Sequence, residues 1–284
     1  MVKNKSKFKK FLLILAIFVS IVFLAIFSTV TYFYHKYDLD IEKLTSVNNG
    51  IKVYSADGTD TTLYNSNRSI TEIETLPSYV LDAFVSVEDK RFYEHNGYDL
   101  KRIVKASMVN FTTKSKSQGA STISQQLVKN ALLTNEKTYS RKIKEIVLSV
   151  KMEKNFTKDE ILEMYLNTIY FGSNAYGIGN ASQIYFNKSP KDLTLNEACC
   201  LAGLIKSPAI YSPKTNYENS VSRRNLVAKT MFDAGKINHE SYQEVLNSPI
   251  NVVESSFDHS YEKQAIMEAC VLLGISEREL INSN

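Results

Sequence analysis

The sequence predicts a mainly α-helical domain preceded by one N-terminal transmembrane helix and a short β-hairpin connector. The first observation is an apolar run without a charged residue over residues 11–34. The second is a series of apolar patterns at helical spacing, two of which begin with capping boxes, Thr157–Glu160 and Thr194–Glu197. The third is that strand and helix patterns do not alternate, so a parallel sheet is not expected. Only residues 51–64, with a turn at Asp57-Gly58, look like a hairpin.

The run over residues 11–34 is long enough to cross a bilayer as a helix. Five lysines within residues 1–10 predict a cytoplasmic N-terminus by the positive-inside rule, with the rest of the chain in the extracellular or periplasmic space. A cleaved signal peptide is the alternative, but the run is longer than a typical signal-peptide core and no small-x-small site follows it. We therefore expect a retained, single-pass signal anchor in the cell membrane.

Charge and cysteine content argue against several classes of function. The formal net charge is +4, and most of it comes from the N-terminal lysines, so nucleic-acid binding is not expected. Three cysteines are too few for a disulfide framework. Cys199 and Cys200 are adjacent within an apolar helical pattern and no C-x-x-C motif is present, so we interpret them as core residues and not as metal ligands.

The stretch from Val85 to Gly97 holds the first candidate site. An apolar helical pattern ends there in two adjacent acids, Glu88 and Asp89, and Phe92 and His95 follow. A carboxylate at the end of an apolar run is partly desolvated, and such a group can serve as a general base. The alternative is an acidic pair on a solvated helix end.

The second candidate segment is the start of a polar helix that follows residues 112–119, a predicted mobile loop. We expect Ser121 to cap this helix and Thr122 to lie in its first turn, with Gln126 and Lys129 on the same face as Thr122. Hydroxyl and amide groups bind sugar hydroxyls, and an ammonium group neutralises phosphate. The alternative is a capped helix with a solvated polar face.

The third candidate segment is Arg141-Lys142-x-x-Glu145. The helical pattern places Glu145 on the side of the two cations and away from the apolar stripe. One interpretation is an exposed ion pair that contributes little to stability. The other is a second carboxylate held among cations, facing a substrate that carries phosphate.

Together these three motifs resemble those of the peptidoglycan glycosyltransferase family, which includes monofunctional transglycosylases and the N-terminal half of class A penicillin-binding proteins. Later segments match as well, among them Tyr165-Leu166-Asn167 and Tyr170-Phe171-Gly172, and the resemblance covers about residues 50–245. It implies a lysozyme-like fold of two lobes with an extended cleft between them. It also implies lipid II as substrate, a disaccharide-pentapeptide on undecaprenyl pyrophosphate.

The resemblance implies a role for each matching residue. Glu88 would be the general base that takes the proton from the 4-hydroxyl of the acceptor, and Glu145 would organise the donor pyrophosphate and its cations. The reaction would form a β-1,4 bond with inversion and release undecaprenyl pyrophosphate. A divalent cation, magnesium or manganese, is expected without an organic cofactor, and its ligands are not identifiable. The positions expected to contact substrate are Asp89, Phe92, His95, Ser121, Thr122, Gln125, Gln126, Lys129, Lys137, Arg141, Lys142, Asn167 and Tyr170.

We divide the chain into a basic cytoplasmic tail (1–10), the signal anchor (11–34), the connector (35–68), the glycosyltransferase domain (69–248) and a C-terminal tail (249–284). The C-terminal tail is similar to the linker that leads to a transpeptidase domain in bifunctional relatives, and no such domain is expected here. A monofunctional enzyme and a truncated bifunctional one both fit. The expected partners are lipid II, the nascent glycan strand, the bilayer, and transpeptidases with divisome or elongation proteins, but no nucleic acid.

Two other functions stay open from the sequence. A muramidase-like hydrolase would also use two carboxylates, although the cations around Glu145 favour transfer from a pyrophosphate. A non-catalytic scaffold in wall synthesis would tolerate the loss of either Glu88 or Glu145, and both are present.

Overall fold

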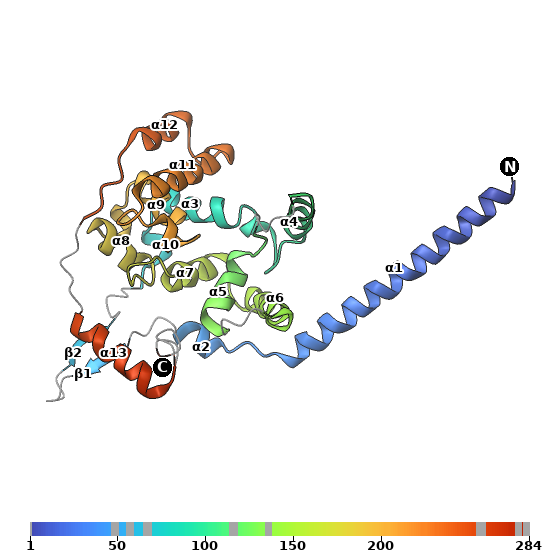
Figure 1. The fold of residues 1–284 in the computed structure, drawn as a ribbon, viewed down its shortest axis with the longest axis horizontal. Coiled ribbons are helices and arrows are strands. Elements are labelled where there is room, and N and C mark those ends of the chain that lie inside the picture. Colours follow the sequence, from blue (N-terminus) through green and yellow to red (C-terminus); the bar gives the residue numbers. More distant parts are fainter. Residues whose placement is uncertain are drawn as a thin grey trace.

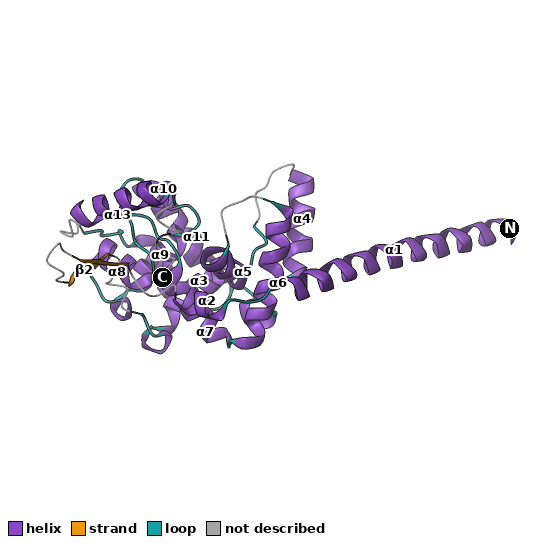
Figure 2. Cartoon of the chain, turned by 90° about the horizontal axis from the view of Figure 1, so that it is seen from below, coloured by secondary structure: helices purple, strands orange, loops and turns teal. Residues whose placement is uncertain are grey.

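The long helix α1 (Val2–Lys36) projects away from a helical body in both views of the molecule (Figure 1 and Figure 2). The computed structural model describes residues 2–46, 51–54, 60–64, 70–113, 119–133, 138–253, 260–275 and 280. Within α1, Lys10–Lys36 is long and apolar enough to cross a membrane, and its apolar 18-residue window is 0 % buried. By length and composition this segment fits the predicted anchor.

The body is mainly α-helical, as predicted. Strands β1 (Ile51–Tyr54) and β2 (Asp60–Tyr64) pair antiparallel with Ile51 opposite Tyr64, and residues 55–59 between them lie outside the described residues. The helices are α2 (Ile41–Ser46), α3 (Ser78–Glu88), α4 (Leu100–Thr113), α5 (Ile123–Leu132), α6 (Tyr139–Asn155), α7 (Lys158–Thr168), α8 (Ile178–Phe186), α9 (Leu195–Leu204), α10 (Pro208–Tyr211), α11 (Tyr217–Asp233), α12 (His239–Asn247) and α13 (Ser260–Leu273), with 3-10 turns η1 (Ile73–Thr75), η2 (Phe92–Glu94) and η3 (Pro190–Asp192).

The buried core joins two groups of helices. Helices α3, α9 and α11 pack against one another, and α5 packs against α6 and α7 (Figure 1). The groups meet in one apolar cluster, in which Phe84 of α3 lies edge-on to Phe171, with ring centroids 6.0 Å apart. Because α3 ends at Glu88 and α5 begins at Ile123, this packing decides how the ends of these two helices meet.

The capping boxes predicted at Thr157–Glu160 and Thr194–Glu197 are confirmed at the starts of α7 and α9. The prediction for α5 was wrong by one residue, because Thr122 and not Ser121 is its N-cap. The Thr122 hydroxyl accepts from the backbone N–H of Gln125 at 3.1 Å, and the Gln125 side chain accepts from the Thr122 N–H at 3.3 Å. Gln125 decides the register, since a capping box needs Glu or Gln three residues after the cap.

The adjacent cysteines are core residues, as predicted. Cys199 and Cys200 on α9 are buried, with their sulfurs 3.6 Å from Met231 and Ser220 of α11. Burial raises the pKa of Cys199 from its ordinary 9.0 to about 12 and that of Cys200 to about 11. Both groups therefore remain neutral thiols at physiological pH.

The C-terminal end of α1 and the residue that follows it contact the body. Lys151 on α6 donates to the backbone carbonyl of Tyr37 at 2.5 Å, and Lys154 donates to the hydroxyl of Tyr34 at 2.9 Å. Helix α2, which the sequence did not predict, buries Leu44 and packs against α5. These contacts join the end of α1 to the helices that carry the second and third motifs.

Asn167, near the end of α7, ties the segment before α3 to the body. Its side-chain oxygen accepts from the backbone N–H of Thr71 at 2.9 Å, and its NH2 group donates to the carbonyls of Thr71 and Glu163, both at 3.0 Å. Asn167 is buried. The sequence suggested a substrate contact for Asn167, whereas the structure gives its amide an internal structural role.

We expect Asn167→Ala to lower the free energy of unfolding by about 2–3 kcal/mol, because the buried backbone groups of Thr71 lose these partners. Denaturant unfolding of the full chain in detergent measures this difference. Asn155→Ala is the control, since that exposed side chain makes one bond, to the Lys151 carbonyl at 2.7 Å. Equal losses in the two variants would contradict the tether.

Candidate active site

The Glu88 carboxylate lies at the C-terminal end of α3 and is hydrogen-bonded by a side chain of α5. Its Oε2 accepts a hydrogen bond from Gln126 Nε2 at 2.7 Å. Arg102 on α4 donates to the backbone carbonyl of Glu88 at 2.5 Å and so satisfies an acceptor left open at the helix end. Glu88 is half-buried, so its carboxylate has a fixed direction and is still accessible.

Tyr165 on α7 supports this contact. Its hydroxyl donates to Gln126 Oε1 at 3.4 Å, which turns the NH2 end of that amide toward Glu88. Burial raises the pKa of Tyr165 well above its ordinary value of 10.0, and the negative charges of Glu88 and Asp89 raise it further. The phenol therefore stays protonated at physiological pH and keeps its role as donor.

Asp89 is 0 % exposed, so it does not belong to a solvated acidic pair. Its Oδ2 accepts from the backbone N–H of Ile123 at 3.0 Å and lies 2.9 Å from His95 Nε2. Arg102 Nη1 lies 3.6 Å from the other carboxylate oxygen. A buried carboxylate is costly unless it is paired in this way. Asp89 thus links the end of α3 to the start of α5, and no ligand can reach it in this conformation.

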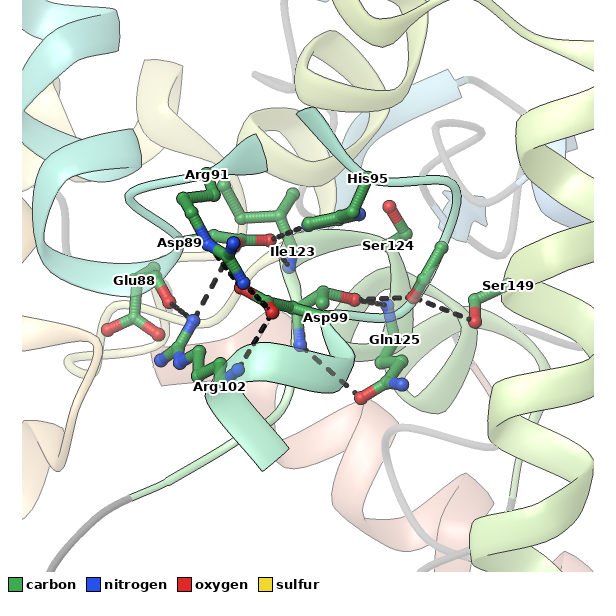
Figure 3. A network of polar contacts seen from close by, with 12 residues as sticks. Glu88, Asp89, Arg91, His95, Asp99, Arg102, Ile123, Ser124, Gln125 and Ser149 are labelled. Atoms are coloured by element: carbon green, nitrogen blue, oxygen red, sulfur yellow. Dashed lines mark hydrogen bonds and ion pairs between the residues drawn. The ribbon is translucent and has the colours of Figure 1, made fainter. Parts of the chain in front are cut away.

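Gly97 allows the loop after Asp89 to pass directly against α6. Its φ is +90°, and a Cβ there would lie 2.8 Å from backbone atoms of Ser149 and Val150. The Gly97 carbonyl accepts from Thr122 Oγ1 at 2.8 Å and from Ser149 Oγ at 3.2 Å. Figure 3 shows the resulting network, with Glu88 at one end and Ser149 at the other.

Glu145 is 2 % exposed and is bonded by two cations of its own helix, α6. Arg141 Nη1 donates to Oε2 at 2.8 Å, and Lys142 Nζ donates to Oε1. The interpretation of an exposed ion pair is therefore wrong. Lys142 also donates to Ser121 Oγ at 2.9 Å and to Gln125 Oε1 at 3.3 Å. The carboxylate holds the two cations close together against their mutual repulsion.

Two neighbouring residues of α5 connect the two carboxylates. Gln126 bonds Glu88 directly, and Gln125 bonds Lys142, which bonds Glu145. Within the described part of the chain, Gln125 Nε2 and Arg141 Nε are buried donors without a hydrogen-bond partner. A buried donor left unpaired costs about 1–3 kcal/mol. Because both nitrogens are buried, a ligand beside Glu145 could pair with them only after the surrounding side chains rearrange.

Several charged residues that the sequence did not single out belong to the same network, and we consider three of them: Arg102, Glu153 and Lys158. Glu153 on α6 accepts from Ser124 Oγ at 2.5 Å and pairs with Lys158 Nζ at 2.6 Å. In the sequence all three are ordinary charged residues on helices. Only their tertiary contacts distinguish them from solvated surface charges.

The other predicted positions lie in different surroundings. Phe92 is buried in the loop after α3, and Lys129 lies on α5. Lys137 is outside the described residues. Tyr170 is exposed and packs on Tyr176, with ring centroids 4.7 Å apart, and no contact of the described residues joins it to Glu88 or Glu145.

Helix α4 exposes an apolar face beside this network. Leu100, Val104 and Met108 are 63 %, 51 % and 66 % exposed. Exposed apolar side chains grouped in this way are typical of a surface that contacts a protein or a membrane. A pocket of about 490 Å³ is lined by Leu100, Lys101, Val104, Lys105, Met108 and Val109. Because Arg102 of the same helix bonds the Glu88 carbonyl, the apolar face is on the helix that adjoins the carboxylate.

The described residues contain no group of three His, Cys, Asp or Glu side chains that could hold a metal ion. Both oxygens of Glu145 are already bonded by Arg141 and Lys142. These side chains therefore do not form a protein cage for the expected divalent cation. Magnesium is often held mainly by substrate phosphates and water, and an ion of that kind needs few protein ligands.

Comparison with known proteins identifies the family. The model of the transglycosylase family matches residues 57–232. The chain belongs to this family. Penicillin-binding protein 1A of Aquifex aeolicus (strain VF5) is 45 % identical over 205 residues, which are 71 % of this chain and 28 % of that protein. Penicillin-binding protein 1A of Escherichia coli (strain K12) is 41 % identical over 223 residues, 77 % of this chain and 26 % of that protein.

The transglycosylase chain thus spans 28 % and 26 % of the length of these two relatives. The crystal structure of penicillin-binding protein 1A from Haemophilus influenzae superimposes with a TM-score of 0.43 at 24 % identity, covering 78 % of this chain and 24 % of that one. That superposition is too loose to add to the family assignment. The family match nevertheless spans all three motifs that the sequence singled out.

We expect Gly97→Ala to destabilise the transglycosylase by about 2–3 kcal/mol, because a methyl group at this φ would push α6 away from the loop. Gly235→Ala is the matched control. Its φ is +69° and no atom lies within 4 Å of the position that a Cβ would take, so only backbone strain of about 1 kcal/mol applies. Denaturant unfolding compares the two variants. An equal loss in both would show that the close contact with α6 does not matter.

Proposed function

We propose that this transglycosylase polymerises lipid II into β-1,4-linked glycan strands and releases undecaprenyl pyrophosphate. The observation that supports this most is that neighbouring residues of α5 hold Glu88 and Glu145 in opposite surroundings. The half-buried Glu88 is suited to accept a proton, and the buried Glu145 between two cations is suited to organise phosphate. These are the two requirements of a transfer from a pyrophosphate to a hydroxyl group.

In this proposal Glu88 is the general base. Among the described residues Gln126 is the one donor to its carboxylate, through Oε2, so Oε1 can take the proton of the acceptor's 4-hydroxyl. The hydroxyl oxygen attacks the anomeric carbon of the donor while that proton moves to Glu88. The bond from the anomeric carbon to the pyrophosphate breaks with inversion, and the pyrophosphate leaves with the electron pair. A positioned base contributes about 10²–10⁴-fold to such a step.

Arg141 and Lys142 neutralise the leaving pyrophosphate, which needs positive charge and not a proton donor. The side chains of Arg141 and Lys142 are 20 % and 40 % exposed, which supports a bound anion at this place. Glu145 keeps the cations in position before the substrate arrives. Ser121, Lys129 and Lys137 complete the proposed substrate contacts.

We assign residues 69–248 to the glycosyltransferase domain and propose that its two helix groups are the lobes of a lysozyme-like fold with the substrate cleft between them. Residues 1–10 and 11–34 are the cytoplasmic tail and the anchor, residues 35–68 the connector, and residues 249–284 the C-terminal tail. In this arrangement the domain lies outside the cell. The apolar face of α4 supports contact with lipid, where a lipid-linked substrate is found. Transpeptidases and divisome or elongation proteins are the proposed partners.

We expect Glu88→Gln to reduce polymerisation of lipid II by the purified full chain about 10²–10⁴-fold, because the amide cannot accept the proton. Gel analysis of glycan chains made from labelled lipid II measures the loss. Glu94→Gln, an exposed acid on η2, is the control and should keep full activity. Unchanged chains from Glu88→Gln would refute the assignment, and release of soluble fragments from finished sacculi by the wild type would favour a hydrolase.

We expect Glu145→Gln to slow polymerisation about 100-fold, because Arg141 and Lys142 lose the anion that orders them for the pyrophosphate. The same gel assay, started with a preformed lipid-linked strand as donor, tests whether the loss lies at the donor side. Glu244→Gln, an exposed acid on α12, is the control. A donor requirement unchanged from the wild type would contradict this role.

A further inference from the structure

We propose that Glu153 and Lys158 are positioning residues that fix the direction of Glu88, an inference that rests on the proposed function of that carboxylate. The described contacts of Glu153 and Lys158 do not include Glu88 itself. They include the loop that follows Glu88 and the first turn of α5, which carries the Gln126 partner of Glu88.

Glu153 has a side chain that is 3 % exposed, and its two oxygens have different partners. Oε1 accepts from Ser124 Oγ at 2.5 Å, and Oε2 pairs with Lys158 Nζ at 2.6 Å. Ser124 lies two residues before Gln126 in α5. The carboxylate on α6 thereby holds the first turn of α5 in place.

Lys158, the first residue of α7, completes the connection to the loop. Besides pairing with Glu153, its ammonium group donates to the backbone carbonyl of His95 at 2.6 Å. It also lies 4.5 Å from the centroid of the Phe92 ring, a cation–π distance. One ammonium group therefore joins α6, α7 and the loop after Glu88.

The His95 ring lies between two buried acids. Its Nε2 is 2.9 Å from Asp89 Oδ2, and its Nδ1 is 3.8 Å from Glu153 Oε1. Only the contact with Asp89 is a hydrogen bond, and Nδ1 has no hydrogen-bond partner among the described residues, so Glu153 acts on the ring through charge alone. We call Asp89, His95, Glu153 and Lys158 the clasp.

The clasp matters for the proposed reaction because a general base acts only within hydrogen-bond reach of the proton that it removes. A displacement of about 1 Å can cost about 100-fold in rate. If the first turn of α5 shifts, Gln126 shifts with it and the Glu88 carboxylate turns away from the acceptor hydroxyl. The effect should fall on kcat and not on KM, because Glu153 and Lys158 are not proposed to contact substrate.

The experiment compares Glu153→Gln, Lys158→Met and the double variant in the full chain. Glu153→Gln keeps an oxygen for Ser124 but removes the charge that Lys158 needs. We expect each single variant to lower kcat for lipid II polymerisation about 10-fold with KM changed less than about 2-fold. The double variant should be no slower than the slower single variant, because both remove the same ion pair.

The matched controls are Asp233→Asn and Lys229→Met, which break an exposed ion pair of 2.9 Å on α11 and should leave kcat unchanged. Hydrogen exchange provides a readout that needs no activity. Amides of residues 89–97 and 122–126 should exchange faster in Glu153→Gln, with the rest of the domain unchanged.

Four outcomes would overturn the proposal: an unchanged kcat, a raised KM at constant kcat, a loss of kcat that only follows the fraction unfolded, or faster exchange across the whole domain. Failure of the wild type to polymerise lipid II would instead refute the proposed function. In that case local exchange at residues 89–97 would still show whether the clasp holds the loop.

Discussion

The buried carboxylate of Asp89 is the interaction on which the arrangement of the three motifs depends. A carboxylate loses its hydration on burial, and that loss exceeds the gain from a single partner. The Ile123 amide and the His95 ring bond Asp89 Oδ2, whereas Oδ1 has no hydrogen bond among the described residues and lies 3.6 Å from the Arg102 guanidinium. The Ile123 N–H is one of the backbone donors at the start of α5 that have no acceptor within the helix. The negative charge of Asp89 therefore also interacts favourably with the positive end of the helix dipole. The end of one helix and the start of another are thus fixed by one charge.

Side chains of helix α5 determine the positions of both carboxylates that we consider functional. Gln126 donates a hydrogen bond to Glu88. Gln125 accepts one from Lys142, which in turn donates to Glu145. The two amides are consecutive residues, so a movement of α5 would displace the partners of both acids. The same short helix also packs against α2, which follows α1. The candidate site and the junction with α1 therefore share a common structural element.

Much of this could be predicted from the sequence, because the relevant signals were local. Capping boxes located the starts of α7 and α9, and apolar context placed Cys199 and Cys200 in the core. The cap of α5 was missed by one residue because two hydroxyl residues are adjacent there and only the following Gln125 separates them. The burial of Glu145 and the roles of Glu153 and Lys158 could not be predicted, since they depend on which helix packs on which. Leu100, Val104 and Met108 of α4 repeat at helical spacing and are nevertheless exposed, because burial depends on which elements pack against the helix.

The burial of both cysteine thiols of α9 has a practical consequence for labelling. The sequence contains three cysteines, and two of them lie in the core as neutral thiols that reagents cannot reach. Cys270 on α13 is partly exposed. A maleimide dye added to the folded protein will therefore attach at that position alone, and the unaltered chain carries its own single-site reporter for following α13 by fluorescence.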